Sequence, residues 1–215
     1  AGHRYQVLLE QFREVDRLID PTGVQNDSQL SIRFDPSYEQ VTIHAIRIRR
    51  NGVVINKLDP AKVQVLRREQ DMEEFLYDGS YTAICELDDV RPGDILEESY
   101  SITGWSPSFG DHFEESIPWS YGVPIAHELV RVLVPQDRLV WFRSQAGAPP
   151  LEEKRTANGS TEYSAEMLQV AAVPDEDDVP PEVMRFGFIE ATEFADWDGV
   201  RAQCLQLFNV DTILP

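Results

Sequence analysis

The chain has 215 residues, of which 42% are hydrophobic and 10% aromatic, as expected for a folded globular protein and not for a disordered tail. Its formal net charge of -19 disfavours binding to nucleic acid and to anionic membrane surfaces. No apolar run approaches the roughly 18 residues of a membrane span. The two cysteines, Cys85 and Cys204, form neither a disulfide framework nor a metal-binding pattern.

The first part of the chain has the patterning of β-strands. Residues 4–15 are rich in strand formers, and residues 28–35 alternate apolar and polar side chains as a half-buried strand does. In 40–58, two apolar runs flank Asn51-Gly52, a dipeptide that favours a tight hairpin because both residues tolerate positive φ. These segments predict two strands followed by a hairpin.

The next run, residues 61–87, also favours strands. It contains a turn candidate at Asp78-Gly79, and a helix over 67–76 is an alternative for part of it. We therefore expect two extended segments here, with their connection less well defined by the pattern.

A turn and a long loop follow. In 89–104, Pro92-Gly93 predicts a turn before a strand, because proline presets φ and glycine accepts the left-handed conformation. Residues 105–124 contain three prolines and several aromatic residues, and they predict an ordered loop between sheets.

The second half returns to strand patterning. Residues 125–135 and 138–145 predict strands, and 152–168 predict a hairpin. Its centre, Asn158-Gly159, is also the start of a glycosylation sequon, and we interpret it as a turn. A proline-bounded acidic connector (173–183) and a last extended run (184–192) follow.

Many short strand candidates without a βαβ rhythm predict an all-β protein built as an antiparallel β-sandwich. We expect one β-sandwich domain over residues 1–190 and a C-terminal helix and tail over 191–215.

The C-terminal segment 192–208 has helical periodicity, and Thr192 or Asp196 is a candidate cap. We expect its apolar face to pack on the sandwich or on a neighbouring chain, which makes Cys204 a core residue and not a nucleophile. The residues of that face are Phe194, Trp197, Val200, Cys204, Leu207 and Phe208.

The other cysteine, Cys85, is the second candidate for a catalytic thiol. Cys85 precedes His112, His127 and Asp137, which is the order of a Cys/His/Asp site, but "TAICEL" favours a strand that places no helix N-terminus behind the sulfur. His44 lies inside a predicted strand and is interpreted as a packed histidine.

Carboxylates cluster in "DEDD" (175–178) and "GDHFEE" (110–115), where solvated charge is preferred over a calcium site because neither has the EF-hand spacing. No catalytic, cofactor-binding or metal-binding residue is predicted.

Aromatic residues crowd the predicted loop 105–124. If they are exposed, they predict a recognition patch for a peptide or a glycan, and if they are buried they cover one end of the sandwich, which is the reading we favour. The residues are Trp105, Phe109, Phe113, Trp119 and Tyr121.

The chain resembles a bacterial domain of unknown function that is found N-terminal to transglutaminase-like, cysteine-peptidase-like cores. The resemblance covers roughly residues 5–208 and is most specific in 32–113. Its motifs are Phe34-Asp35-Pro36-Ser37-Tyr38, Arg50-Asn51-Gly52, Tyr77-Asp78-Gly79, Leu87-Asp88-Asp89-Val90-Arg91-Pro92-Gly93-Asp94, Tyr100, Gly104, Pro107 and Phe109.

The resemblance implies a β-sandwich of immunoglobulin-like character in a periplasmic or cell-envelope protein. It also implies a noncatalytic accessory module whose partner is a downstream transglutaminase-like domain with a Cys/His/Asp core. A self-standing binding domain for peptide or glycan is the alternative. The candidate partner-contact residues are Trp105 and Phe109 in the aromatic loop, and Phe194 and Trp197, which match the family's Phe and Trp at the join.

Overall fold

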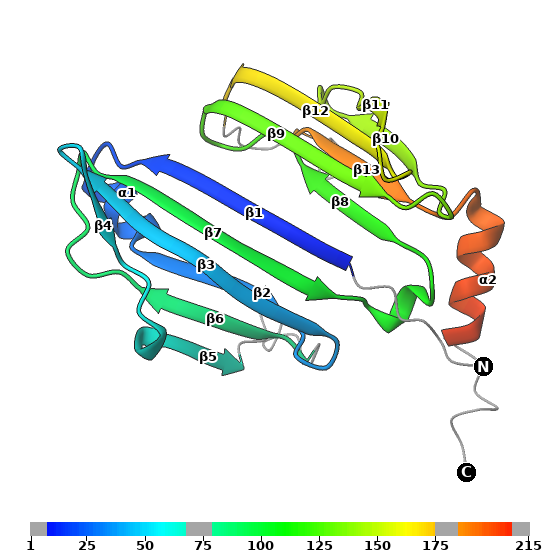
Figure 1. The fold of residues 1–215 in the computed structure, drawn as a ribbon, viewed down its shortest axis with the longest axis horizontal. Coiled ribbons are helices and arrows are strands. Elements are labelled where there is room, and N and C mark those ends of the chain that lie inside the picture. Colours follow the sequence, from blue (N-terminus) through cyan, green and yellow to red (C-terminus); the bar gives the residue numbers. More distant parts are fainter. Residues whose placement is uncertain (1–7, 68–78, 175–184, 208–215) are drawn as a thin grey trace, which may run out of the picture. The chain divides into compact units, whose positions relative to one another are not determined.

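A computed structural model describes residues 8–67, 79–174 and 185–207 (Figure 1). The chain divides into two compact units, residues 1–107 and 108–215. One sandwich over residues 1–190 was expected from the sequence, whereas the chain divides between Pro107 and Ser108. The division has a physical basis, because each unit has its own pair of sheets and its own buried apolar clusters.

The first unit contains two antiparallel sheets, in the strand orders β1-β7-β3-β4 and β2-β6-β5. The bounds are β1 (Leu8–Arg17), β2 (Gln29–Phe34), β3 (Glu39–Arg50), β4 (Val53–Asn56), β5 (Val63–Arg67), β6 (Tyr81–Glu86) and β7 (Ile95–Gly104), with the short helices α1 (Pro21–Asp27) and η1 (Pro60–Lys62).

The core of the first unit lies between these sheets. Ile46, Ile48 and Leu96 of one sheet join Ile32 and Cys85 of the other in a single buried cluster. The predicted hairpin is confirmed: Asn51 and Gly52 have φ of 50° and 80° and connect β3 to β4. The possible helix over 67–76 and the Asp78 half of the second turn fall largely outside the described residues.

The second unit also contains two antiparallel sheets, β10-β13-β8 and β11-β12-β9. Its buried residues include Trp119, Val130, Ala165 and Ile189. The bounds are η3 (Pro107–Phe109), β8 (Glu114–Pro118), β9 (Ile125–Val134), β10 (Trp141–Gln145), β11 (Glu152–Arg155), β12 (Thr161–Val170), β13 (Phe188–Thr192) and α2 (Trp197–Leu207).

The all-β antiparallel prediction with a C-terminal helix is confirmed (Figure 1). The predicted hairpin at Asn158-Gly159 connects β11 to β12, with Gly159 at φ 89°. The predicted loop 105–124 is wrong in part, because β8 lies within it and pairs with β13. Proline is tolerated there because Pro118 ends the strand.

Helix α1 was not expected from the sequence. Its start signal is nevertheless recognisable, because Asp20 accepts a hydrogen bond from the Gly23 N–H and Pro21 begins the helix.

The described part of the chain contains no helix long and apolar enough to cross a membrane. The acidic connector at 175–183 and the Phe208 end of the predicted helix lie outside the described residues.

Candidate functional site

The motif at residues 87–94 forms the turn before β7, and its carboxylates bind basic side chains of the β3–β4 region. Asp94 is only 1% exposed, and its two oxygens accept hydrogen bonds from Arg50 Nε and Nη2, each 2.8 Å long. The Arg91 N–H donates a third bond of 2.9 Å. The hydrogen bonds from Arg50 lower the pKa of Asp94 from its ordinary value, against the opposing effect of burial.

The two preceding carboxylates extend this network at the surface. Asp89 accepts hydrogen bonds from Arg50 Nη1 at 2.9 Å and from Arg91 Nε at 2.6 Å, and these lower the pKa of its carboxyl group. Asp88 lies 2.7 Å from Lys62 Nζ, whose hydrogen bond is the main cause of a lowered Asp88 pKa. The most specific motif of the sequence therefore builds an ion-pair network that fixes a turn.

The other described motif residues also hold backbone in place. Asp35 Oδ1 accepts hydrogen bonds from the N–H and the hydroxyl of Ser37, which closes the turn between β2 and β3. At Gly104, an added Cβ would lie 2.2 Å from the backbone oxygen of Tyr38, so only glycine fits there. These motif residues are structural in their contacts.

An acidic pocket of about 240 Å³ opens in the first unit, between β1, β7, β2 and the end of α1. Its carboxylates are Glu14, Asp16, Asp27 and Glu98, and the strand register places Glu14 directly opposite Glu98. Glu98 Oε1 is buried and has no hydrogen-bond partner. This pocket was not predicted from the sequence, although charged residues two apart on a strand, such as Glu14 and Asp16, indicate one polar face.

Burial and neighbouring negative charge shift the titration of this pocket. Desolvation, followed by repulsion from Glu14, Asp16 and Asp27, raises the pKa of Glu98 to about 7. Desolvation and Asp27 also raise the pKa of Asp16. The pocket can therefore take up a proton near neutral pH. Among the described residues, no three His, Cys, Asp or Glu side chains are arranged to hold a metal ion.

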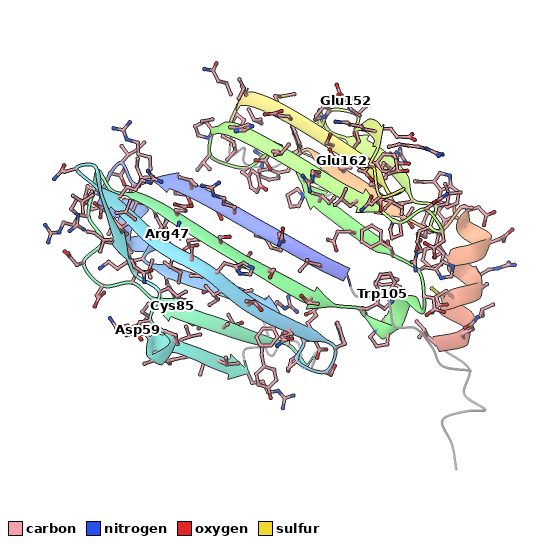
Figure 2. The ribbon with its side chains drawn as sticks, in the orientation of Figure 1. Arg47, Asp59, Cys85, Trp105, Glu152 and Glu162 are labelled. Atoms are coloured by element: carbon pink, nitrogen blue, oxygen red, sulfur yellow. The ribbon has the colours of Figure 1, made fainter. Side chains whose placement is uncertain are left out.

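The cysteine and histidine candidates are distributed over the two units, and each is described by its own surroundings. Cys85 lies on β6 (Figure 2), is 1% exposed, and has a thiol whose pKa burial raises. It belongs to the first unit, whereas His112, His127 and Asp137 belong to the second. His112 stacks on Phe194 with ring centroids 4.4 Å apart, and His127 Nε2 lies 2.8 Å from a Glu166 oxygen. His44 bonds to the Ser101 hydroxyl at 2.8 Å, in keeping with a packed cross-strand histidine.

The core assignment of Cys204 is wrong. Cys204 is exposed on α2, and Trp197 and Leu205 are 85% and 64% exposed. The reason is the rotation of the helix: Gln203 Nε2 donates a hydrogen bond of 3.1 Å to the Ser108 oxygen, and Gly199 lies against Phe194. A polar and a small residue of α2 therefore contact the rest of the second unit. Of the predicted apolar face, Phe194 is buried, whereas Trp197, Cys204 and Leu207 are exposed in the described chain.

We expect the two thiols to differ in reactivity. A disulfide reagent such as Ellman's reagent should modify Cys204 rapidly in the native protein and Cys85 only after denaturation, because Cys204 is exposed to the reagent and Cys85 is buried. Cys204→Ser is the control and should abolish the rapid phase. Rapid modification that persists in this variant would contradict the burial of Cys85.

The four predicted contact residues have different environments. Trp105 is partly buried in the first unit, and Phe194 is a 9% exposed core residue of the second. Phe109 and Trp197 are 37% and 85% exposed.

The predicted cap of α2 is confirmed at Asp196, whose Oδ1 accepts a hydrogen bond of 2.9 Å from the Gly199 N–H. We define the α2 surface as Trp197, Cys204, Leu205 and Leu207.

Residues 9–174 match the family model of a Domain of Unknown Function, DUF3857, for which a structure has been solved. The chain belongs to the DUF3857 family. The matched range spans both units and includes the described network of Arg50 and Asp94. No curated protein matches this DUF3857 chain.

The fold of this DUF3857 chain is similar to the crystal structure of a protein from Parabacteroides distasonis described as a putative protease. The two share 13% sequence identity with a TM-score of 0.73, and the match covers 87% of this chain and 37% of that protein. At this identity the likeness shows the fold alone. This chain therefore spans little more than a third of the length of the protein it matches.

Proposed function

We propose that this DUF3857 chain is a noncatalytic accessory module that precedes a transglutaminase-like core and positions a substrate or partner for that core's Cys/His/Asp site. The observation that carries the proposal is the α2 surface, where large apolar side chains of a capped helix face solvent. Such a helix face is expected to contact another protein segment, because burying apolar area is favourable.

Two further facts support the proposal. The fold matches part of a longer protein described as a putative protease. The motif residues of this chain bind one another and the backbone, and Cys85 is a buried thiol with a raised pKa. The proposed compartment is the periplasm or cell envelope, which follows from the sequence resemblance.

The first test asks whether the module has activity of its own. The purified chain should show no thiol-dependent peptidase or acyl-transfer activity toward casein or a glutamine-donor peptide. Turnover that Cys85→Ala or Cys204→Ala abolishes would overturn the proposal.

The second test concerns the α2 surface in the longest natural protein that contains the chain. We expect its reading frame to continue beyond Pro215 into a Cys/His/Asp core, and Trp197→Ser/Leu205→Ser should weaken protection of the module–core contact in hydrogen exchange. Arg201→Ser, an exposed change on the same helix, is the matched control. A reading frame without such a core would contradict the proposal.

A binding domain for peptide or glycan is the second candidate function, and exposed aromatic side chains favour it. Phe109 and Tyr121 are each 37% exposed, whereas Trp119 is 1% exposed and belongs to the core, as the burial interpretation predicted. Phe109→Ala/Tyr121→Ala should reduce retention on a peptidoglycan or peptide affinity column if this function is correct. Unchanged retention would exclude these two aromatic side chains as binding residues.

A further inference from the structure

Four arginines lie on the outer face of the β1-β7-β3-β4 sheet. Ile46, Ile48 and Leu96 point into the core, so their chain neighbours Arg47, Arg49 and Glu97 point outward. Directly paired residues share a face, and the register sets Val15 and Arg47 on either side of Glu97 and sets Arg17 and Arg49 on either side of Ile95. We call Arg13, Arg17, Arg47 and Arg49 the arginine face; Figure 2 labels Arg47 on β3.

One buried carboxylate lies at the centre of the arginine face. The Glu97 side chain is 7% exposed, and one of its oxygens lies 3.0 Å from Arg13 Nη2. Arg47 and Arg49 lie farther from it, each with a nitrogen 3.9 Å from a Glu97 oxygen. The side chains of Arg13, Arg47 and Arg49 remain 67%, 47% and 55% exposed. Glu97 therefore gathers guanidinium groups without covering them.

The face has an excess of positive charge within a strongly acidic protein. Four arginines face one glutamate, whereas the whole chain has a formal net charge of -19. Val15 and Val54, which share this side of the sheet, are 54% and 51% exposed. Exposed arginine next to aliphatic surface, without lysine, is a composition typical of protein interfaces.

We propose that the arginine face binds an extended acidic segment of another polypeptide through its carboxylates. Guanidinium groups can bind carboxylates with two parallel hydrogen bonds. The arginine face already binds one carboxylate, that of Glu97, through Arg13. Arg47 and Arg49 are two residues apart on one strand, about 7 Å, which is also the spacing of alternate side chains in an extended peptide.

The charge of the chain selects among anionic partners. A nucleic-acid backbone or an anionic membrane is an extended anionic surface, which also meets the acidic parts of a chain with a net charge of -19, whereas a short peptide can contact the arginine face alone. The inference goes beyond the proposed accessory role, because it concerns the first unit and does not involve α2.

The test measures binding of a fluorescein-labelled peptide of alternating glutamate and valine by anisotropy at low ionic strength. Arg47→Gln/Arg49→Gln should weaken binding about tenfold. Arg131→Gln/Arg201→Gln removes equal charge from exposed sites of the second unit and should change affinity by less than about twofold. Circular dichroism of each variant checks that the fold is retained.

A third variant distinguishes binding from a structural role. Glu97→Gln removes the internal carboxylate that competes for the arginines, so it should tighten peptide binding about threefold. A purely structural cluster predicts no gain. The proposal is overturned if the wild-type chain fails to bind the peptide saturably, if both double variants lose affinity equally, or if anionic phosphatidylglycerol vesicles bind more tightly than the peptide.

Discussion

Replacing Asp94 with Asn is expected to destabilise the protein by about 3 kcal/mol, because removing one partner of a buried ion pair leaves the other charge uncompensated. Asp94 is 1% exposed and binds Arg50 through both oxygens, and the Arg50 side chain is itself only 19% exposed. Asparagine keeps one acceptor oxygen, and its NH2 group replaces the other oxygen and faces the donors that Asp94 now binds. Urea unfolding at pH 7 followed by circular dichroism measures the loss.

Asp89→Asn is the matched control, because Asp89 binds the same arginine from a half-exposed position. Its effect should be clearly smaller than that of Asp94→Asn, since exposed ion pairs contribute little. Equal losses in the two variants would show that burial of Asp94 does not determine the loss of stability.

The stability that Asp94 contributes also depends on pH. Because the pKa of Asp94 is lowered in the folded state, this stability is present above the ordinary value of 3.8 and is lost as the pH falls through the lower, folded pKa.

Replacing Glu98 with Gln is expected to stabilise the protein at pH 8 and to leave it nearly unchanged at pH 4. The folded state raises the pKa of Glu98 from 4.5 to about 7, so the folded chain binds more protons than the unfolded chain between these values. Stability from this group is therefore fully present below pH 4.5 and is lost as the pH rises to about 7. After a discount for partial exposure, we expect a gain of about 1–2 kcal/mol at pH 8.

The measurement is the free energy of unfolding of both proteins at a series of pH values between 4 and 8. Glu153→Gln, an exposed change on β11, is the control and should follow the wild-type profile. Hydrogen exchange should place the stabilisation in β1 and β7, which form the pocket floor. A variant profile parallel to that of the wild type would contradict the raised pKa of Glu98.

In the first unit, the pKa values of two buried or partly buried carboxylates, Asp94 and Glu98, shift in opposite directions. Asp94 is buried with a full set of donors, so its charge is stabilised. Glu98 has a buried oxygen without a partner and faces Glu14 across the strand pair, so its charge is disfavoured. The acidic composition of the chain is thus more than surface solubility, because part of it is organised into a network and a pocket.

Local signals in the sequence predicted the strands and turns well. Asn51-Gly52 forms the two-residue turn of the β3–β4 hairpin, because such a turn depends almost entirely on the φ that its own residues allow. Asn158-Gly159 lies in the longer connection between β11 and β12, where Gly159 takes the positive φ. The cap at Asp196 follows the same rule, since the side chain bonds to backbone three residues away. The missed strand β8 has a weak pattern of glutamates and serine, and it is defined by pairing with β13.

Periodicity and turn chemistry act over a few residues, so the amino-acid sequence was enough to predict an antiparallel all-β protein with a helix near the C-terminus. The division into two units, the bond of Asp94 to Arg50 forty-four residues away and the pairing of Glu98 with Glu14 depend on the tertiary fold. The tertiary fold also turns Gln203 of α2 inward and Trp197 outward. Those outcomes depend on which distant segments pack together, and a helix period defines a face without defining what that face contacts.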